Sequence, residues 1–331
     1  METKILKPSG KAYRLASKLI KSGQIVAFPT ETVYGLGASA LDAEAVKKIF
    51  EAKGRPQDNP LIVHLAKKKD IKKYVRYITG TQQKLINAFM PGPISIVFEK
   101  NDKICSSVCA GGDTVAIRIP ENKVARKFIA KTHRPICAPS ANTSKRPSPT
   151  IAQHVFDDMN GKIPLIIDGG STNIGIESTV VRCEGPNVYI LRPGKINKEM
   201  IAKKCNLIAI DTIDTSKIPQ SPGTKYTHYK PACDMIIVKT AVIPNINRLY
   251  DNMAKSGMKP IIFCKQEHLP LFSGKTAVAL GVDSTDASAN LFNYLRKYEH
   301  HDLIIAEYFD NGDMVDALFN RMIKSASGNI I

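Results

Sequence analysis

The stretch IVAFPTETVYGLGASALDAEAVKKIFEAKGRPQDNPLIVHL, residues 25–65, decides the fold of the first half of the chain. Its first four residues form an apolar strand that ends at Pro29, because proline cannot extend a paired ladder. Hydroxyl groups and an acid follow at residues 30–32, and then Gly35 and Gly37, which let the backbone approach a ligand closely. A polar loop is therefore expected directly after the strand.

The middle of this stretch predicts an amphipathic helix. Asp42 is a suitable N-cap, and Gly54 stands where a helix C-cap is expected. Helical spacing places four side chains on one face: Val46, Ile49, Phe50 and Lys53. Residues 61–65 then form a second apolar strand. The whole stretch is a strand–loop–helix–strand unit.

Two cations, Lys53 and Arg55, stand where this helix ends, in a sharp turn made by Gly54 and Pro56. Cations fixed in such a turn suit a phosphate or a carboxylate. The alternative is two solvated charges on a surface loop, which is the usual meaning of an arbitrary Lys-x-Arg pair. The neighbouring polar loop and strand ends favour a ligand site here.

Length and composition indicate a soluble α/β protein of two domains. The chain has 331 residues and 43% hydrophobic content, enough for two cores. Neither an apolar run of membrane-spanning length nor an apolar signal core at the N-terminus is visible. The seven cysteines form no CxxC pair, so reduced thiols and a cytoplasmic location are expected, without disulfides or structural zinc.

The positive charge is unevenly distributed along the chain. Residues 1–232 carry 37 Lys and Arg against 19 Asp and Glu, whereas residues 233–331 carry 10 against 11. A basic half suits a polyanion such as RNA, or an anionic substrate such as ATP. The alternative is a lysine-rich, solvated surface, and the lysine runs at 67–69 and 72–73 fit that alternative better.

Further strands and polar loops follow in the first half. Alternation over residues 113–120 places Thr114, Ala116 and Arg118 on one face of a strand. A strand at 135–138 leads into the small polar loop PSANTS, which by itself is typical of a turn. A hairpin is expected from strands at 177–182 and 188–192, and Thr150 with Gln153 predicts a capping box for the helix between these features.

The last hundred residues read as a separate small domain. Four apolar segments alternate with helical ones, which indicates a parallel three-layer α/β domain ending in a helix at 314–325. The four segments are 235–238, 261–263, 277–280 and 303–307. Before them stands SPGTKYTHYKP, residues 221–231, whose composition is that of a linker but whose tyrosines, histidine and lysines are unusual for a passive one.

Several of these segments together resemble the threonylcarbamoyl-AMP synthase family, in its long two-domain Sua5 form. The resemblance rests on PTETVYGLG, KGRPQDNPL, the APSAN loop and the GIESTV strand. The family's signature pairs are present as Lys53 with Arg55 and Ser140 with Asn142. The resemblance implies that the chain has three parts: a YrdC-like catalytic domain at 8–205, a linker over the active site at 206–232, and a Sua5 C-terminal domain at 233–331.

The resemblance also implies a fold and a reaction. The catalytic domain is expected to be a twisted mixed sheet with a basic cavity, and the C-terminal domain a smaller three-layer, Rossmann-like unit. The implied enzyme is a nucleotidyltransferase that converts L-threonine, bicarbonate and ATP into L-threonylcarbamoyl-AMP and diphosphate. This product serves N6-threonylcarbamoyladenosine formation at position 37 of tRNAs that read ANN codons.

Roles of individual residues are likewise implied by the resemblance. The catalytic set is Lys53, Arg55, Ser140 and Asn142. The ATP-binding set is Arg55, Asn59, Thr114, Ser140, Ser148, Arg192 and Tyr226. The threonine-binding set is Thr32, His64, Arg118, Ala138 and Ser178. Mg²⁺ is expected through the ATP phosphates rather than through protein ligands, and tRNA and the downstream threonylcarbamoyl-transferase complex are the expected partners, with no membrane.

Two other functions remain open at this point. One is a basic RNA-binding module without catalysis. The other is the carbamoyl-transfer domain of hydrogenase maturation proteins, although the acylphosphatase and zinc-finger segments of those proteins are not visible. His64 also has a simpler interpretation as a satisfied histidine in an apolar strand, and Cys137 is expected in the core rather than as a nucleophile.

Overall fold

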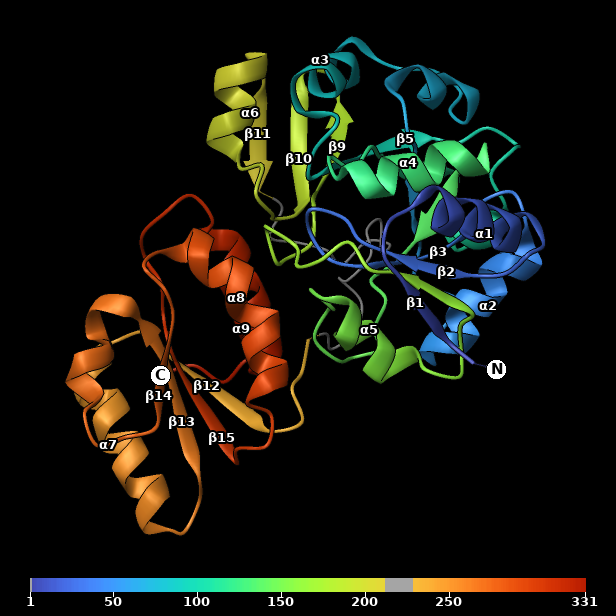
Figure 1. Ribbon diagram of the computed structural model, residues 1–331. Helices are drawn as coiled ribbons and strands as arrows, with labels where there is room; N and C mark the ends of the chain where they lie inside the picture. The colour runs from blue at the N-terminus through green and yellow to red at the C-terminus, as the bar shows by residue number, and fades with distance from the viewer. Residues whose placement is uncertain (1, 212–228) are drawn as a thin grey trace. The chain divides into compact units, whose positions relative to one another are not determined.

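A computed structural model describes residues 2–211 and 229–331 (Figure 1). These residues form two compact units, each with its own sheet. The units are not consecutive stretches of sequence, because residues 145–148 and 174–176 belong with the C-terminal unit. Among the helices described, none is both long and apolar enough to cross a membrane.

The first unit is built on a mixed sheet, as the sequence predicts. The described strands lie in the order β1-β8-β2-β3-β7-β4-β6-β5-β9-β10-β11, with parallel and antiparallel neighbours. The strands are β1 (Lys4–Leu6), β2 (Val26–Phe28), β3 (Gly35–Ser39), β4 (Ile62–His64), β5 (Ile94–Glu99), β6 (Thr114–Arg118), β7 (Ile136–Ala138), β8 (Leu165–Ile167), β9 (Thr179–Glu184), β10 (Asn187–Arg192) and β11 (Ile208–Asp211). The helices are α1 (Gly10–Lys21), α2 (Ala43–Lys53), α3 (Gly80–Phe89), α4 (Lys123–Thr132), α5 (Ala152–Met159) and α6 (Lys198–Cys205), with 3₁₀ turns η1 (Lys68–Lys73) and η2 (Ser106–Cys109).

Residues 25–65 fold as their caps and glycines predict. Asp42 Oδ1 accepts the backbone N–H of Ala45 at 3.1 Å, which caps α2. Gly54 ends that helix with φ of 60°, the left-handed conformation that glycine adopts without strain. Gly37 is also required, since a Cβ there would lie 2.7 Å from Cγ2 of Ile136 on the neighbouring strand β7. Strand, helix and turn are therefore confirmed.

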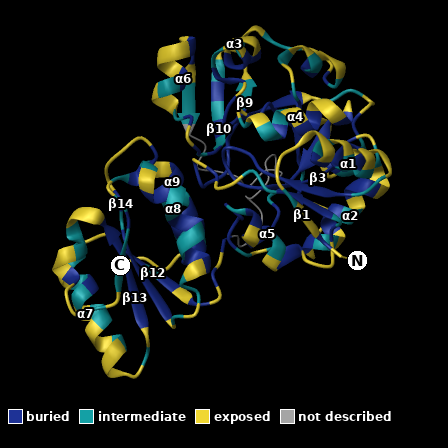
Figure 2. Cartoon of the chain, in the orientation of Figure 1, coloured by how far each residue is buried: buried dark blue, intermediate teal, exposed yellow. Residues whose placement is uncertain are grey.

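Helices cover both faces of this sheet (Figure 2). Helices α1 and α4 pack together and bury Ile20 and Phe128 against β2, β7 and β8. Helices α2, α3 and α5 contribute to the larger core on the opposite face. A third, small apolar cluster comprises Ile62, Val97, Ala116 and Val180, on strands β4, β5, β6 and β9. Because residues two apart on a strand share a face, His64 and Arg118 lie beside this cluster.

Two details differ from the sequence-based expectations. The capping box at Thr150 and Gln153 is wrong: α5 has Ile151 at its N-cap, with no side-chain cap. The reason is that Nδ1 of His154 accepts the backbone N–H of Thr150 at 3.3 Å, while Gln153 donates to Asp157. In addition, β11 pairs in parallel with β10, so the sheet continues beyond residue 205.

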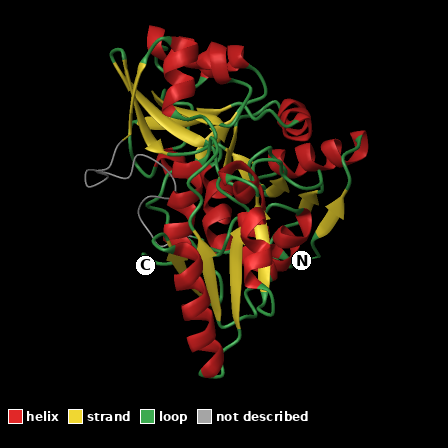
Figure 3. Ribbon diagram, turned by 90° about the vertical axis from the view of Figure 1, so that its left-hand side faces the viewer, coloured by secondary structure: helices red, strands yellow, loops and turns green. Residues whose placement is uncertain are grey.

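The second unit is a parallel α/β domain, as predicted. Its strands lie side by side (Figure 3). Their order is β12-β15-β13-β14, and all neighbours are parallel. The elements are β12 (Asp234–Val238), α7 (Val242–Lys255), β13 (Pro260–Lys265), η3 (Gln266–Phe272), β14 (Ala277–Gly281), α8 (Ser284–Lys297), β15 (Leu303–Glu307) and α9 (Val315–Ser325). Apolar residues of α7 pack with β12, β13 and β15, while α8 packs on β14 and α9 on β12.

Candidate active site

Lys53 is the last residue of α2, and its side chain is 2% exposed. Its Nζ donates to the backbone oxygens of Ser140 at 2.6 Å and Asn142 at 2.5 Å. The Ser140 hydroxyl in turn donates to Oδ1 of Asn142 at 2.5 Å. Lys53 of the first pair singled out in the sequence therefore meets both residues of the second pair, 87 and 89 positions away, in one hydrogen-bonded cluster.

Backbone contacts hold the loop after β7 against the loop after β2. The N–H of Ala141 donates to the carbonyl of Tyr34 at 2.9 Å, and Ser140 forms a bridge with Gly35. Tyr34 itself is buried, and its hydroxyl donates to the carbonyl of Gly170 at 2.7 Å. Main-chain hydrogen bonds thus hold the polar segments 29–37 and 138–142 side by side.

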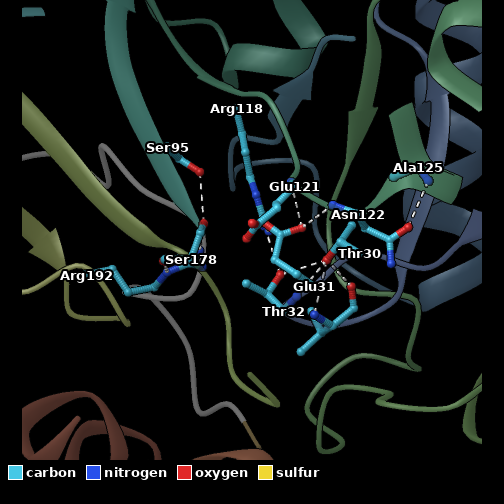
Figure 4. Close-up of polar contacts among 11 residues, drawn as sticks. Thr30, Glu31, Thr32, Ser95, Arg118, Glu121, Asn122, Ala125, Ser178 and Arg192 are labelled. Carbon is cyan, nitrogen blue, oxygen red and sulfur yellow. Dashed lines mark hydrogen bonds and ion pairs between the residues drawn. The ribbon is translucent and has the colours of Figure 1, made fainter. Parts of the chain in front are cut away.

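Arg118, the last residue of β6, is 4% exposed and reaches the polar loop after β2 (Figure 4). Its two Nη atoms donate to Thr32 Oγ1 at 2.9 Å and to Glu31 Oε1 at 2.6 Å. The other carboxylate oxygen of Glu31 accepts the backbone N–H groups of Glu121 and Asn122. A buried carboxylate with these partners fixes the guanidinium in position.

The ionisation of Glu31 follows from this environment. Burial alone would raise the pKa of its carboxyl, but the adjacent Arg118 and the backbone N–H groups hold that pKa below its usual value. Glu31 is therefore a carboxylate at neutral pH, and the pair with Arg118 is a buried salt bridge.

His64 ends β4 and pairs in register with Arg118 across the parallel ladder. The ring is buried and lies edge-on to Phe28, with centroids 5.8 Å apart. Its Nδ1 is 3.0 Å from the carbonyl of Ile62, so Nδ1 carries the proton in the neutral ring and Nε2 keeps its lone pair. Burial and the nearby Arg118 lower the pKa of His64 to about 3, so the ring is neutral at pH 7.

Ser178 precedes β9 and connects two further polar side chains (Figure 4). Its hydroxyl is 2.9 Å from that of Ser95 on β5. Arg192, the last residue of β10, donates from Nη2 to the Ser178 hydroxyl and from Nε to its carbonyl, both at 3.1 Å. All three side chains are buried, with Arg192 5% exposed.

The other residues expected at the site have varied surroundings. Ala138 ends β7 beside Ile62, whereas Thr114 is exposed at the opposite end of β6 from Arg118. Asn59 is fully buried, and within the described residues neither its amide nitrogen nor its amide oxygen has a hydrogen-bond partner. Arg55 is partly exposed, and Ser148 is buried and belongs to the second unit by sequence, while Tyr226 lies outside the described residues.

The sequence reasoning assigned no role to Glu31 or Ser95. A strand arginine whose face otherwise carries small residues needs a carboxylate partner when it is buried, and Glu31 stood in the polar loop already singled out. Ser95 carried no comparable signal, because an isolated serine in an apolar strand is common. Cys137 is fully buried in the core, as expected, and burial raises the pKa of its thiol.

Fold and site together define a class: a two-domain α/β protein whose mixed sheet carries buried, hydrogen-bonded Lys, Arg, Ser and Asn side chains near its strand ends. The family model described as "Telomere recombination", which takes in Sua5, YciO and YrdC proteins, matches residues 18–194. The model described as "Threonylcarbamoyl-AMP synthase, C-terminal domain" matches residues 196–327.

Relatives match over nearly the whole chain. Threonylcarbamoyl-AMP synthase of Bacillus subtilis is 39% identical over 323 residues, covering 96% of this chain and 93% of the relative. That of Pyrococcus abyssi is 41% identical over 329 residues, covering 96% and 95%. The crystal structure of P. abyssi Sua5 complexed with L-threonine has a TM-score of 0.93 at 38% identity, covering 100% of this chain and 99% of that one. The chain belongs to the threonylcarbamoyl-AMP synthase family, in its two-domain Sua5 form.

Proposed function

We propose that this chain is an L-threonylcarbamoyladenylate synthase, which makes L-threonylcarbamoyl-AMP and diphosphate from L-threonine, bicarbonate and ATP. The observation that carries the proposal is the cluster in which Lys53 of one signature pair is hydrogen-bonded to Ser140 and Asn142, the other signature pair. The proposal extends to this chain the activity for which its relatives from B. subtilis and P. abyssi are named.

The proposed chemistry is attack by a carbamate oxygen, formed from the threonine amine and CO₂, on the α-phosphorus of ATP. A new P–O bond forms, the bond to the bridging oxygen of the β-phosphate breaks, and diphosphate leaves. Such a transfer needs positioning and charge neutralisation more than covalent help. Lys53 and Arg55 would offset phosphate charge, and Ser140 and Asn142 would align the phosphates through hydrogen bonds.

Threonine would be held by Thr32, His64, Ala138, Ser178 and Arg118. An arginine has five N–H donors, and Glu31 and Thr32 take one each from Arg118. The remaining donors include Nε, which is buried and has no hydrogen-bond partner within the described residues. They suit the threonine carboxylate, and the lone pair on neutral His64 suits a donor such as the threonine amine.

The nucleotide would be bound by Arg55, Asn59, Thr114, Ser140, Ser148, Arg192 and Tyr226. Of these residues, Asn59 has the clearest physical support for a role in ligand binding. A buried amide without a hydrogen-bond partner destabilises the folded chain by about 1–3 kcal/mol, unless a ligand supplies the missing hydrogen bonds. Tyr226 and most of the linker at 206–232 lie outside the described residues, so a linker closing over the site stays a prediction.

Mg²⁺ would enter on the ATP phosphates. In the ranges that the structure describes, no three His, Cys, Asp or Glu residues lie close enough together to hold a metal ion. Phosphate oxygens are ligands that Mg²⁺ commonly takes in nucleotide sites. The ion would supply charge neutralisation, while the residues above bind and orient the substrates.

The remaining expectations stand as parts of the same proposal. The catalytic domain would centre on residues 8–205, with β1 and β11 extending its sheet on either side, and the C-terminal domain would comprise residues 233–331. The product would pass to tRNA and the threonylcarbamoyl-transferase complex, for adenosine 37 of tRNAs reading ANN codons, in the cytoplasm. A relative's crystal structure with L-threonine supports the amino-acid substrate, and the basic first half of the chain supports anionic partners.

Mass spectrometry of quenched reactions tests the proposed product. The purified chain is incubated with ATP, Mg²⁺, L-threonine and ¹³C-bicarbonate. We expect threonylcarbamoyl-AMP carrying the labelled carbon, and little of it from the Ser140→Ala variant. Release of AMP or ADP without a labelled threonylcarbamoyl adduct would overturn the assignment.

A further inference from the structure

A chain of hydrogen bonds leads from Thr30 through Thr32 to Arg118 (Figure 4). Thr30 Oγ1 is 2.7 Å from the carbonyl oxygen of Val33 and 2.8 Å from Thr32 Oγ1. Thr32 Oγ1 accepts from Nη1 of Arg118 at 2.9 Å. Thr30 and Thr32 are 2% and 0% exposed, so neighbouring protein atoms determine where their hydroxyl hydrogens point. The proposed function gives Thr30 no role.

The contacts of Thr30 fix the direction of its own hydroxyl. A hydroxyl has one hydrogen, and a carbonyl oxygen can only accept, so the contact with Val33 needs the hydrogen of Thr30. If that hydrogen pointed at Thr32, two oxygen atoms would face each other at 2.7 Å without a hydrogen between them. The backbone N–H groups of Thr32 and Val33 also point at Thr30 Oγ1, at 3.1 and 3.3 Å. Thr30 therefore donates to Val33 and accepts from its other neighbours.

The polarity of Thr32 follows from that of Thr30. Because the hydrogen of Thr30 is already used, the contact between the two hydroxyls takes the hydrogen of Thr32. Arg118 has only donors, so it takes one of the two lone pairs on Thr32 Oγ1. One lone pair remains and no hydrogen. Thr32 can thus offer a ligand an acceptor and nothing else.

His64 supplies a second acceptor next to the first. It pairs in register with Arg118 on the neighbouring strand, so the two side chains lie on one face of the sheet. Its Nδ1 is bound to the carbonyl of Ile62, which leaves the lone pair on Nε2. The site therefore combines the remaining donors of Arg118 with two acceptors. L-threonine has the matching groups: a carboxylate, and two groups with donor hydrogens, its amine and its hydroxyl.

We propose that Thr30 is a positioning residue for the amino-acid substrate, which acts by holding the hydroxyl hydrogen of Thr32 away from it. Thr30 itself contacts Thr32 and the backbone rather than the ligand. Without the Thr30 hydroxyl, the hydrogen of Thr32 loses its acceptor and can turn toward the N–H or O–H groups of the substrate. Binding must then reorient Thr32 first, which lowers affinity. The inference rests on the proposed function for the identity of the ligand, L-threonine.

Isothermal titration calorimetry with L-threonine tests the proposal on the full chain. Thr30→Val and Thr30→Ala both remove the hydroxyl, one keeping the branched shape and the other avoiding any clash, whereas Thr30→Ser keeps the hydroxyl. The matched control is Thr132→Val. Like Thr30, Thr132 is buried, donates to a backbone carbonyl and accepts a backbone N–H, but it does so at the end of α4. Thermal unfolding of every variant accompanies the titrations.

We expect Thr30→Val and Thr30→Ala to raise the Kd for L-threonine about fivefold, the size of one ordinary hydrogen bond. Thr30→Ser and Thr132→Val should stay within about twofold of the unmodified chain. A double-mutant cycle shows whether Thr30 acts through Thr32. In a Thr32→Val background, adding Thr30→Val should change the Kd little, because no Thr32 hydroxyl is left to orient.

An unchanged Kd in both Thr30→Val and Thr30→Ala would overturn the proposal. So would an equal loss of affinity in Thr30→Ser, or the same loss from Thr30→Val with and without Thr32→Val, since either result indicates a general effect on the loop. No binding of L-threonine by the unmodified chain would overturn the proposed substrate, and this inference with it. Binding by the unmodified chain together with unaffected Thr30 variants would overturn the inference alone.

Discussion

The cations of the candidate site and the exposed cations of α4 belong to the same unit but differ in their surroundings. Lys53, Arg118 and Arg192 are 2%, 4% and 5% exposed, and each donates hydrogen bonds to fixed oxygen atoms. Lys127 and Lys131 are exposed on α4, and within the described residues neither forms a salt bridge. The first group is held in place, whereas the second is surrounded by solvent.

This difference determines what each group can do. Burying a charge is costly, and hydrogen bonds offset that cost only in a particular geometry. A buried cation therefore acts at short range on a ligand of defined shape. An exposed cation costs little to place and acts through its field, which salt screens. Substitutions should consequently affect stability and turnover in the first group, and polyanion binding in the second.

The largest expected effect is on the Arg118–Glu31 pair. Arg118→Ala should lower the free energy of unfolding by about 3–5 kcal/mol, because it leaves Glu31 buried without its counter-ion. Urea unfolding measures the change, with Lys131→Ala as the exposed control, expected within about 0.5 kcal/mol of the unmodified chain. Adding Glu31→Gln to Arg118→Ala should restore part of the loss. A similar loss of stability in Arg118→Ala and Lys131→Ala would contradict the distinction between buried and exposed cations.

The next effect concerns turnover. Arg55→Ala and Ser140→Ala should each reduce kcat/KM by at least about tenfold, equivalent to about 1.4 kcal/mol, because both residues would contact the phosphates. Lys68→Ala should change little, since its Nζ donates to the carbonyl of Asn87 at an exposed position. Diphosphate release under limiting ATP measures all three. Comparable losses at the three positions would mean that the lysine-rich surface takes part in the reaction.

A pH effect on stability is expected from the buried His64. The pKa of His64 is about 3 in the folded chain, against an ordinary value of 6.5. Between these two pH values the unfolded chain therefore binds a proton at His64 that the folded chain does not. The free energy of unfolding should therefore fall as pH drops through this window, by up to about 1.4 kcal/mol per pH unit. Glu31, whose pKa is lowered, adds its own loss only below the ordinary carboxyl range.

Urea unfolding between about pH 5 and 6.5 largely avoids the carboxyl groups, which titrate lower, and comparison with His64→Leu separates this ring from the other histidines. His64→Leu should flatten the dependence, because it removes the buried ring whose pKa is lowered. A dependence that survives His64→Leu undiminished would show that the ring is not the group responsible.

The smallest expected effect is at Ser95, which supports Ser178 from the neighbouring strand. Ser95→Ala removes a buried hydrogen bond, so the free energy of unfolding should fall by about 0.5–1.5 kcal/mol. Thr81→Ala removes an exposed bond to the carbonyl of Gly185 and should cost less. Thermal unfolding of the pair measures the order, and the reverse order would weaken the contrast between buried and exposed polar groups.

Local signals and register made much of the fold predictable. Asp42 and Gly54 capped α2 as expected, and alternation placed Ala116 and Arg118 on one face of β6. The capping box predicted at Thr150 does not form, because the ring of His154 accepts the backbone N–H of Thr150. In a capping box the side chain of Gln153 would accept that N–H. Competition of that kind depends on side-chain placement, which spacing alone does not reveal.

The site was predictable only in part, for a related reason. Lys53 and Ser140 were found by motif and resemblance, and the structure brings them together. The pairing of Glu31 with Arg118 joins residues 87 apart, so it required the sheet order before it could be seen.

Diphosphate release from ATP tests the assigned activity most directly. The purified chain is assayed with ATP and Mg²⁺ in four mixtures: complete, without L-threonine, without bicarbonate, and with L-serine replacing L-threonine. A threonylcarbamoyl-AMP synthase should release diphosphate only when L-threonine and bicarbonate are both present, and much more slowly with L-serine. Equal release without bicarbonate, or with L-serine, would contradict the assignment.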